Sequence, residues 1–101
     1  MYFEMMRMND VDQFIGRKDT IIVDVRKAEE YWQGHIKTAV NVPYEQGQNI
    51  VRYVSGYDYI LIYCHTGSLS MMAARDLYGV NSRVFNLCGG LRAYRGILVR
   101  T

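Results

Sequence analysis

The sequence contains little proline and no long apolar run. One proline among 101 residues excludes a collagen-like or proline-rich chain. No apolar stretch approaches the roughly 20 residues that a helix needs to cross a bilayer. The first residues also lack the basic region, long apolar region and small-residue cleavage site of a secretion signal. We therefore expect a soluble protein of the cytoplasm with no membrane partner.

Charge of one sign is not concentrated anywhere in the chain. The 12 Lys and Arg residues against 10 Asp and Glu give a net charge of +2, and these charges are scattered. A nucleic-acid-binding domain usually gathers its basic residues on one face. A mixed, solvated surface is the better interpretation, and we expect no nucleic-acid partner.

Cysteine and histidine are scarce as well. Cys64 and Cys88 are too few for the disulfide framework of a small secreted domain, so we expect both to be reduced thiols. Together with the two histidines, His35 and His65, they do not form the spacings of a zinc site. No metal site is expected, and each cysteine is instead a candidate for thiol chemistry.

The composition that remains is globular. Half of the residues are hydrophobic and 13% are aromatic, which excludes a largely disordered chain, and the length fits one domain over residues 1–101. Residues 20–25 and 58–63 are continuous apolar runs typical of buried parallel strands. The expected strands are 2–6, 20–25, 38–42, 58–63 and 82–87, and the expected helices are 11–15, 26–33, 46–54, 70–78 and 91–94.

This alternation of strands and helices predicts the fold class. Strands that alternate with helices form an α/β domain, whose mainly parallel sheet is flanked by helices on both faces. Asn9 or Asp10 is the expected N-cap of the first helix. One side of helix 70–78 should pack in the core through Met71, Ala74, Leu77 and Tyr78.

Cys64 occupies the most informative position in this pattern. It directly follows the expected strand 58–63, and ligands of open α/β sheets bind beyond the carboxyl ends of the strands. Gly67 allows the next loop to curl so that successive N–H groups point into one concavity, at the start of a helix. Such donors favour the thiolate, the nucleophilic form of cysteine. Cys64 is therefore the candidate nucleophile.

Short motifs along most of the chain occur in a characteristic order. They are IVDVR at 22–26, EY at 30–31, GHI at 34–36, AVNVP at 39–43, IYCHTGS at 62–68 and NLCGG at 86–90. In this order they resemble the rhodanese-like domain family. The resemblance implies a five-stranded parallel sheet flanked by helices, and transfer of sulfane sulfur through a cysteine persulfide without a metal or organic cofactor.

The resemblance also assigns the candidate site. It implies that Cys64 carries the persulfide and that the residues after it form the substrate-binding loop. These loop residues are His65, Thr66, Gly67, Ser68, Leu69 and Ser70. The implied partner is a small sulfur-containing substrate or a persulfide-donating protein: the donor is a persulfide, a polysulfide or, weakly, thiosulfate, and the acceptor is a thiol or cyanide.

Three positions depart from the family pattern. Thr38 stands where a second glycine is expected, and Tyr94 where tryptophan is common. Leu69 occupies the last loop position, where active members often carry an arginine. A cation beside the cysteine would hold a dianion such as thiosulfate, so we expect neutral or protein-bound donors to be preferred. Arg75 and Arg92 are candidates to supply the missing charge.

Four further residues have structural interpretations. Asp24 is expected to cap the turn after its strand, and Arg26 to pair with Glu30 at helical spacing. His35 is expected to be a hydrogen-bonded packing histidine. Cys88 follows a strand at the same sheet edge as Cys64, so it is either a resolving thiol or a spectator.

The sequence leaves three classes of function. A sulfurtransferase that works by double displacement through Cys64 is the leading interpretation. The alternative is a non-enzymatic rhodanese-like module that binds a partner or carries a persulfide. A cysteine phosphatase or arsenate reductase of the Cys-x5-Arg type is the least favoured class, because the seventh position counted from Cys64 is Ser70 and not arginine.

Overall fold

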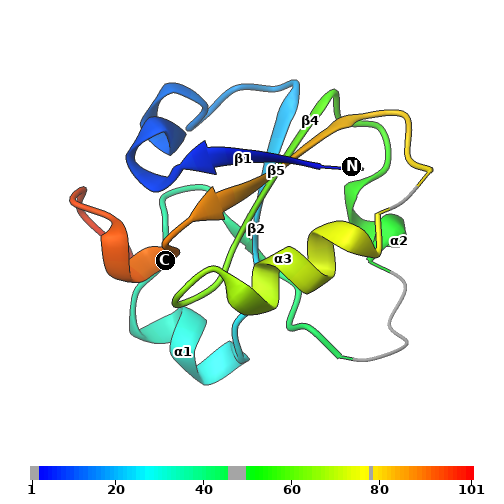
Figure 1. Cartoon of the computed structure of the whole chain (residues 1–101). Helices are drawn as coiled ribbons and strands as arrows, with labels where there is room; N and C mark the ends of the chain where they lie inside the picture. The colour runs from blue at the N-terminus through cyan, green and yellow to red at the C-terminus, as the bar shows by residue number, and fades with distance from the viewer. Residues whose placement is uncertain (1–2, 46–49, 78) are drawn as a thin grey trace.

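Five parallel strands form the sheet of the computed structural model, which describes residues 3–45, 50–77 and 79–101. In chain order the strands are β1 (Glu4–Arg7), β2 (Thr20–Asp24), β3 (Val40–Asn41), β4 (Tyr59–Tyr63) and β5 (Arg83–Cys88). They lie in the order β1-β5-β4-β2-β3 and every neighbouring pair is parallel. Figure 1 shows β1 beside β5, although these strands come from opposite ends of the chain. The expected α/β fold with a five-stranded sheet is confirmed.

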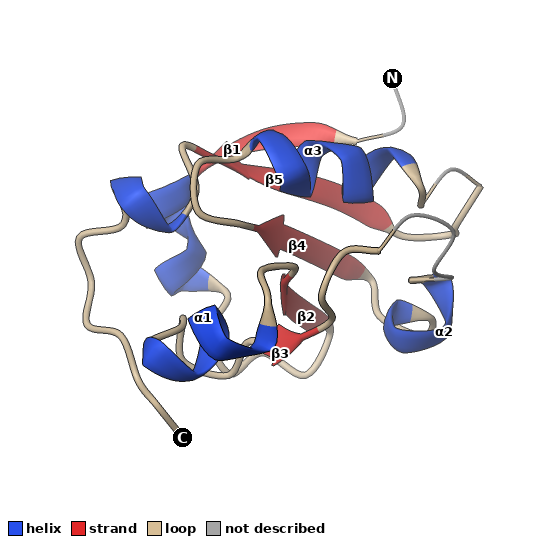
Figure 2. Cartoon of the chain, turned by 90° about the horizontal axis from the view of Figure 1, so that it is seen from below, coloured by secondary structure: helices blue, strands red, loops and turns tan. Residues whose placement is uncertain are grey.

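Helices cover both faces of this sheet, as expected. They are α1 (Ala28–Gln33), α2 (Val51–Val54) and α3 (Ser68–Arg75), with 3-10 helices η1 (Met8–Gln13) and η2 (Leu91–Ala93). Figure 2 shows α1 next to β2 and β3, far from β1. Within the described ranges no helix has both the length and the apolar character needed to cross a membrane.

Two apolar clusters, one on each face, hold these layers together. The first packs α2 and α3 against side chains such as Val23, Ile62 and Val84. The second packs η1 and α1 against side chains such as Leu61 and Leu87. Because helices cover both faces of the sheet at β2 and β4, the sequences of these two strands are nearly continuous apolar runs.

The helices differ from the sequence expectation at their ends. Neither Asn9 nor Asp10 is the N-cap of the first helix, because both lie inside η1 and Arg7 precedes it. The Asn9 side chain instead bonds the backbone of Ala93 and Arg95 at distances of 3.1 and 2.8 Å. Helix α3 begins at Ser68, two residues before the expected start, because Gly67 adopts a left-handed conformation that turns the chain directly into the helix. Residues 46–49 of the expected helix 46–54, and Tyr78, lie outside the described residues.

A buried ion pair lies at the carboxyl end of β2. The guanidinium of Arg26 donates to both carboxylate oxygens of Asp24, with the shortest distance 2.7 Å, and to the carbonyl of Gly34 at 2.6 Å. The expected cap is present, since Asp24 accepts the Arg26 N–H at 2.9 Å. The expected Arg26–Glu30 pair is wrong: Asp24 is two residues away and fully buried, while Glu30 accepts the Lys27 N–H at the start of α1.

Burial and this ion pair together shift the pKa values of Arg26 and Tyr63. Burial lowers the pKa of Arg26, but the hydrogen bond and charge of Asp24 raise it by more, so its net shift is upward. Burial, followed by the charge of Asp24, also raises the pKa of Tyr63 well above its usual range. Tyr63 therefore stays neutral, and its hydroxyl oxygen accepts the Ile36 N–H at 3.1 Å.

Thr38 and Tyr94 show how the fold accommodates the departures from the family pattern. Thr38 has a φ of 71° and is the one non-glycine residue with positive φ in the described part of the chain. An L-residue in this region costs roughly 1–2 kcal/mol, which is the physical reason for a glycine there. Tyr94 donates to Asp12 at 2.6 Å, and burial together with this bond raises the pKa of Tyr94 to about 12.

Replacement of Arg26 by methionine should destabilise the protein strongly, because the Asp24 carboxylate would stay buried without its partner. We expect a loss of about 3–5 kcal/mol in the free energy of unfolding, measured by urea titration. The matched control is Arg83→Met, which removes the exposed Arg83–Glu4 pair and should cost far less. Equal losses in the two variants would contradict a structural role for the buried pair.

Replacement of Thr38 by glycine should stabilise the protein. The Thr38 side chain is exposed, so relief of the strained backbone outweighs the lost contacts, and the entropy of glycine removes part of the gain. We expect a net increase of about 0.5–1 kcal/mol in the free energy of unfolding. Lys37→Gly, at the exposed neighbouring position without positive φ, should instead lower this free energy, and a loss in both variants would refute the strain.

Candidate active site

Cys64 lies where β4, the middle strand of the sheet, ends. Three residues separate it from Ser68, the first residue of α3, so the chain curls through 65–67 and returns over the thiol. The Cys64 residue is only 3% exposed. The position predicted from the sequence, between a buried strand and a helix N-terminus, is confirmed.

Backbone donors from the curl point at the sulfur atom. The Gly67 N–H donates to Cys64 Sγ at 3.1 Å, and the Ser70 N–H donates to it at 3.3 Å. Both donors stand at the beginning of α3, whose dipole adds a positive potential there. This arrangement stabilises negative charge on sulfur, and it supplies the concavity of N–H groups expected around Cys64.

Two glycines allow the curl to close. Gly67 has a φ of 103°, which a side chain would strain. A Cβ atom at Gly90 would lie 2.5 Å from the Cys64 carbonyl oxygen and 2.6 Å from the His65 carbonyl oxygen. Those two carbonyls accept the N–H groups of Leu91 and Arg92 at 2.8 and 3.0 Å. The turn after β5 is therefore bonded directly to the backbone that carries the thiol.

A pocket of about 230 Å³ opens beside Cys64. Its walls come from three segments that are distant in the sequence: 25–30, Pro43 with Tyr44, and the loop 64–69. The parallel strands β2, β3 and β4 end at this edge of the sheet, which brings these segments together. Although Cys64 is almost fully buried, the pocket reaches it.

The predicted substrate-binding residues divide into two groups. His65, Thr66, Ser68 and Leu69 line the pocket with Cys64. Gly67 and Ser70 are buried and do not line it; they lie against the sulfur from the side of α3. Leu69 is partly buried and also packs against the first apolar cluster, so it presents an apolar surface to the pocket.

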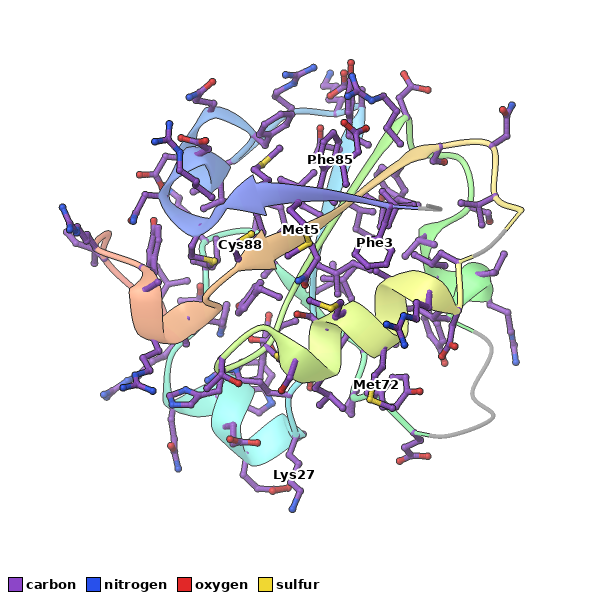
Figure 3. All side chains as sticks on the ribbon, viewed as in Figure 1. Phe3, Met5, Lys27, Met72, Phe85 and Cys88 are labelled. Atoms are coloured by element: carbon purple, nitrogen blue, oxygen red, sulfur yellow. The ribbon has the colours of Figure 1, made fainter. Side chains whose placement is uncertain are left out.

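The charges that line the pocket come from the segment after β2. Arg26 is neutralised by the buried Asp24, so Lys27 and Glu30 are the exposed charged side chains among the described lining residues. Figure 3 shows Lys27 at the outer surface beside α1. Neither Arg75 nor Arg92 lines this pocket; Arg92 borders a separate hollow with Thr66.

Asn86 is a site residue that sequence reasoning missed. It lies on β5, is fully buried, and accepts a 2.5 Å hydrogen bond from the Ser70 hydroxyl. Ser70 in turn lies 3.4 Å from Cys64 Sγ. The signal in the sequence was a polar residue between Phe85 and Leu87, inside the apolar part of the strand.

His35 and Cys88 stand apart from this contact network. His35 is buried and stacks on the Tyr31 ring at 3.7 Å, and its two ring nitrogens lie 2.9 and 3.1 Å from the carbonyl oxygens of Tyr31 and Thr101, which confirms the packing interpretation. Cys88, labelled in Figure 3, is the last residue of β5. Both cysteines are free thiols. Across the described residues, no three His, Cys, Asp or Glu side chains are grouped to hold a metal ion.

Comparisons with known proteins agree with this geometry. A tRNA sulfurtransferase of Desulfurococcus amylolyticus is 34% identical over 92 residues, which are 91% of this chain and 18% of that protein. A Bacillus subtilis protein named as a sulfur carrier, YrkF, is 36% identical over 76 residues, which are 74% of this chain and 41% of that protein. The chain thus spans less than half the length of these two relatives.

A solved structure and a family model complete the comparison. The crystal structure of a rhodanese-related protein from Thermoplasma volcanium superposes with a TM-score of 0.83 at 18% identity, over 98% of this chain and all of that one. The likeness in structure shows the shared fold. The model of the rhodanese-like domain matches residues 8–96. With the thiol loop after β4 and the parallel sheet that carries it, the chain belongs to the rhodanese-like domain family.

Proposed function

We propose that this chain is a sulfurtransferase that moves sulfane sulfur through a persulfide on Cys64. The observation that carries the proposal is the pair of N–H donors from Gly67 and Ser70 on a sulfur that the pocket reaches. These N–H groups stabilise the Cys64 thiolate, which attacks the sulfur-donating substrate. Relatives named as a sulfurtransferase and as a sulfur carrier support the same chemistry.

The reaction takes two displacements at sulfur. The deprotonated Cys64 attacks the sulfane sulfur of the donor; the new S–S bond forms as the donor's S–S bond breaks, and its thiolate or sulfite leaves with the electron pair. A thiolate or cyanide then attacks the outer sulfur of the persulfide, and Cys64 leaves as the thiolate. Neither step consumes an oxidant, a metal or an organic cofactor.

The pocket favours an uncharged or protein-bound donor over a dianion. Leu69 and Tyr44 give it apolar walls, and the charge of Lys27 is opposed by that of Glu30, which lines the same pocket. Thiosulfate would enter without a cation fixed beside the thiol. We therefore propose a persulfide or polysulfide as the preferred donor, with the reducing cytoplasm as the compartment that keeps both thiols free.

The phosphatase class receives no support from the site. Ser70, which stands at the position of the phosphate-binding arginine in that class, is fully buried and lies outside the pocket lining. A persulfide carrier that does not turn over remains the second candidate, since a named sulfur carrier is among the relatives. The first experiment below distinguishes these two candidates.

Cys64→Ser should abolish sulfur uptake and turnover, whereas Cys88→Ser should retain most of both. Intact-protein mass after incubation with polysulfide reports a gain of one sulfur atom, and cyanide should remove it. Release of thiocyanate over many cycles marks an enzyme, while loading without repeated release marks a carrier. Sulfur uptake by the Cys64→Ser variant would refute the assignment of the nucleophile.

Leu69→Arg should raise the use of thiosulfate relative to polysulfide roughly ten- to a hundredfold. A hydrogen bond from a charged group is worth about 1.5–3 kcal/mol, and each 1.4 kcal/mol is about a tenfold change in rate. The measurement is the ratio of kcat/KM values for the two donors. Leu69→Gln, which has similar length without the charge, is the matched control and should leave this ratio nearly unchanged; an equal rise in the control would exclude charge as the cause.

A further inference from the structure

The network beneath Cys64 contains a hydroxyl whose direction is determined by a residue outside the loop. The Ser70 hydroxyl lies 3.4 Å from Cys64 Sγ and 2.5 Å from Asn86 Oδ1. All three side chains are at most 3% exposed, so water does not compete for these bonds. Asn86 comes from β5, whereas the other two residues belong to the segment that carries the thiol.

The orientation of the Asn86 amide follows from its neighbours. Its nitrogen lies 3.3 Å from the Gly67 carbonyl and 3.8 Å from the Met5 sulfur, both of which only accept hydrogen bonds. The amide nitrogen must therefore face these two groups, and its oxygen faces Ser70. A carbonyl oxygen at this position can only accept. The Ser70 hydroxyl has a second acceptor, the Gly67 carbonyl at 3.1 Å, but Asn86 Oδ1 at 2.5 Å is closer and takes the single proton.

The position of that proton decides what Ser70 offers to sulfur. With its proton directed to Asn86, the Ser70 oxygen presents a lone pair to Cys64 and accepts the S–H of the neutral thiol. A hydrogen bond to the neutral form of an acid disfavours the charged form. The Gly67 and Ser70 N–H groups act in the opposite direction, since they stabilise the anion.

We propose that Asn86 is a positioning residue that holds the Ser70 proton away from Cys64, and so limits the fraction of reactive thiolate in the resting protein. The inference rests on the proposed function of Cys64 as nucleophile. The buried thiol is thereby balanced between two backbone donors that favour its anion and one hydroxyl oxygen that favours its neutral form.

The test is the pH profile of Cys64 alkylation by iodoacetamide in the full chain, with Cys88→Ser as background so that one thiol reacts. Asn86→Leu removes the closest acceptor of the Ser70 proton, so the thiolate then competes for this proton with the Gly67 carbonyl alone. We expect its profile to move to lower pH and the rate at neutral pH to rise about three- to tenfold. Asn86→Asp holds the proton more firmly and adds negative charge near the sulfur, so its profile should move to higher pH.

Ser70→Ala separates positioning from a general disturbance of the core. Removal of the S–H acceptor should move the profile to lower pH, whereas loss of a hydroxyl that donates to the thiolate would move it to higher pH. In the Ser70→Ala background, Asn86→Leu should cause no further shift. A shift to higher pH in Ser70→Ala, a further shift in the double variant, or shifts of Asn86→Leu and Asn86→Asp in the same direction would overturn the proposal.

Sulfur loading measured by intact mass on the same proteins keeps the two proposals distinct. Failure of the Cys88→Ser protein to take up sulfur would refute the persulfide function and leave the alkylation profiles interpretable. Normal sulfur uptake combined with unchanged profiles in all variants would refute the role of Asn86 alone. Far-UV circular dichroism identifies any variant that does not fold, and Ser70→Ala and Asn86→Asp give the sign of the effect without Asn86→Leu.

Discussion

The buried contact between Asp24 and Arg26 is the interaction on which the pocket depends. It joins the end of β2 to the Gly34 carbonyl, and so fixes the point where the chain turns back after α1. The same region binds the return segment, because the Asn41 amide donates to the carbonyls of Asp24 and Arg26. Pro43 and Tyr44 form part of the pocket wall as a result. The Asp24–Arg26 pair therefore holds the segments of the pocket in place, although its net charge is zero and it offers no charge to a ligand.

The sequence predicts this fold well wherever local pattern determines structure. The runs 20–25 and 60–63 are buried on both faces, and such strands can be recognised without knowledge of their neighbours. The sequence pattern does not predict where strands and helices begin and end. Strand β3 covers only Val40–Asn41 of the expected 38–42 because Thr38 turns out of the extended region, and α3 starts early because of the conformation of Gly67.

In the candidate site, too, contacts between residues close in the sequence could be predicted and contacts between distant residues could not. The loop around Cys64 is contiguous in sequence, so its curl and its backbone donors could be expected from Gly67 and the following helix. Lys27, Asn86 and Gly90 come from other elements, and only the strand order brings them to the thiol. The direction of the Ser70 side chain, away from the pocket, likewise depends on a partner sixteen positions later.

The depth of the Cys64 sulfur restricts the shape of any protein that exchanges sulfur with it. Two cysteines joined through sulfur have Cα atoms only about 4.4–6.8 Å apart, and an intervening sulfur atom lengthens this span modestly. Because the Cys64 residue is only 3% exposed and lines the pocket, its sulfur is beyond the reach of a cysteine on a flat, rigid surface. Under the proposed function, a cysteine that delivers sulfur to Cys64 or receives it would have to stand on a slender, protruding stretch of chain, such as a loop tip or a terminus. The shape of the pocket around Cys64 thus excludes most folded protein surfaces before any chemical recognition takes place.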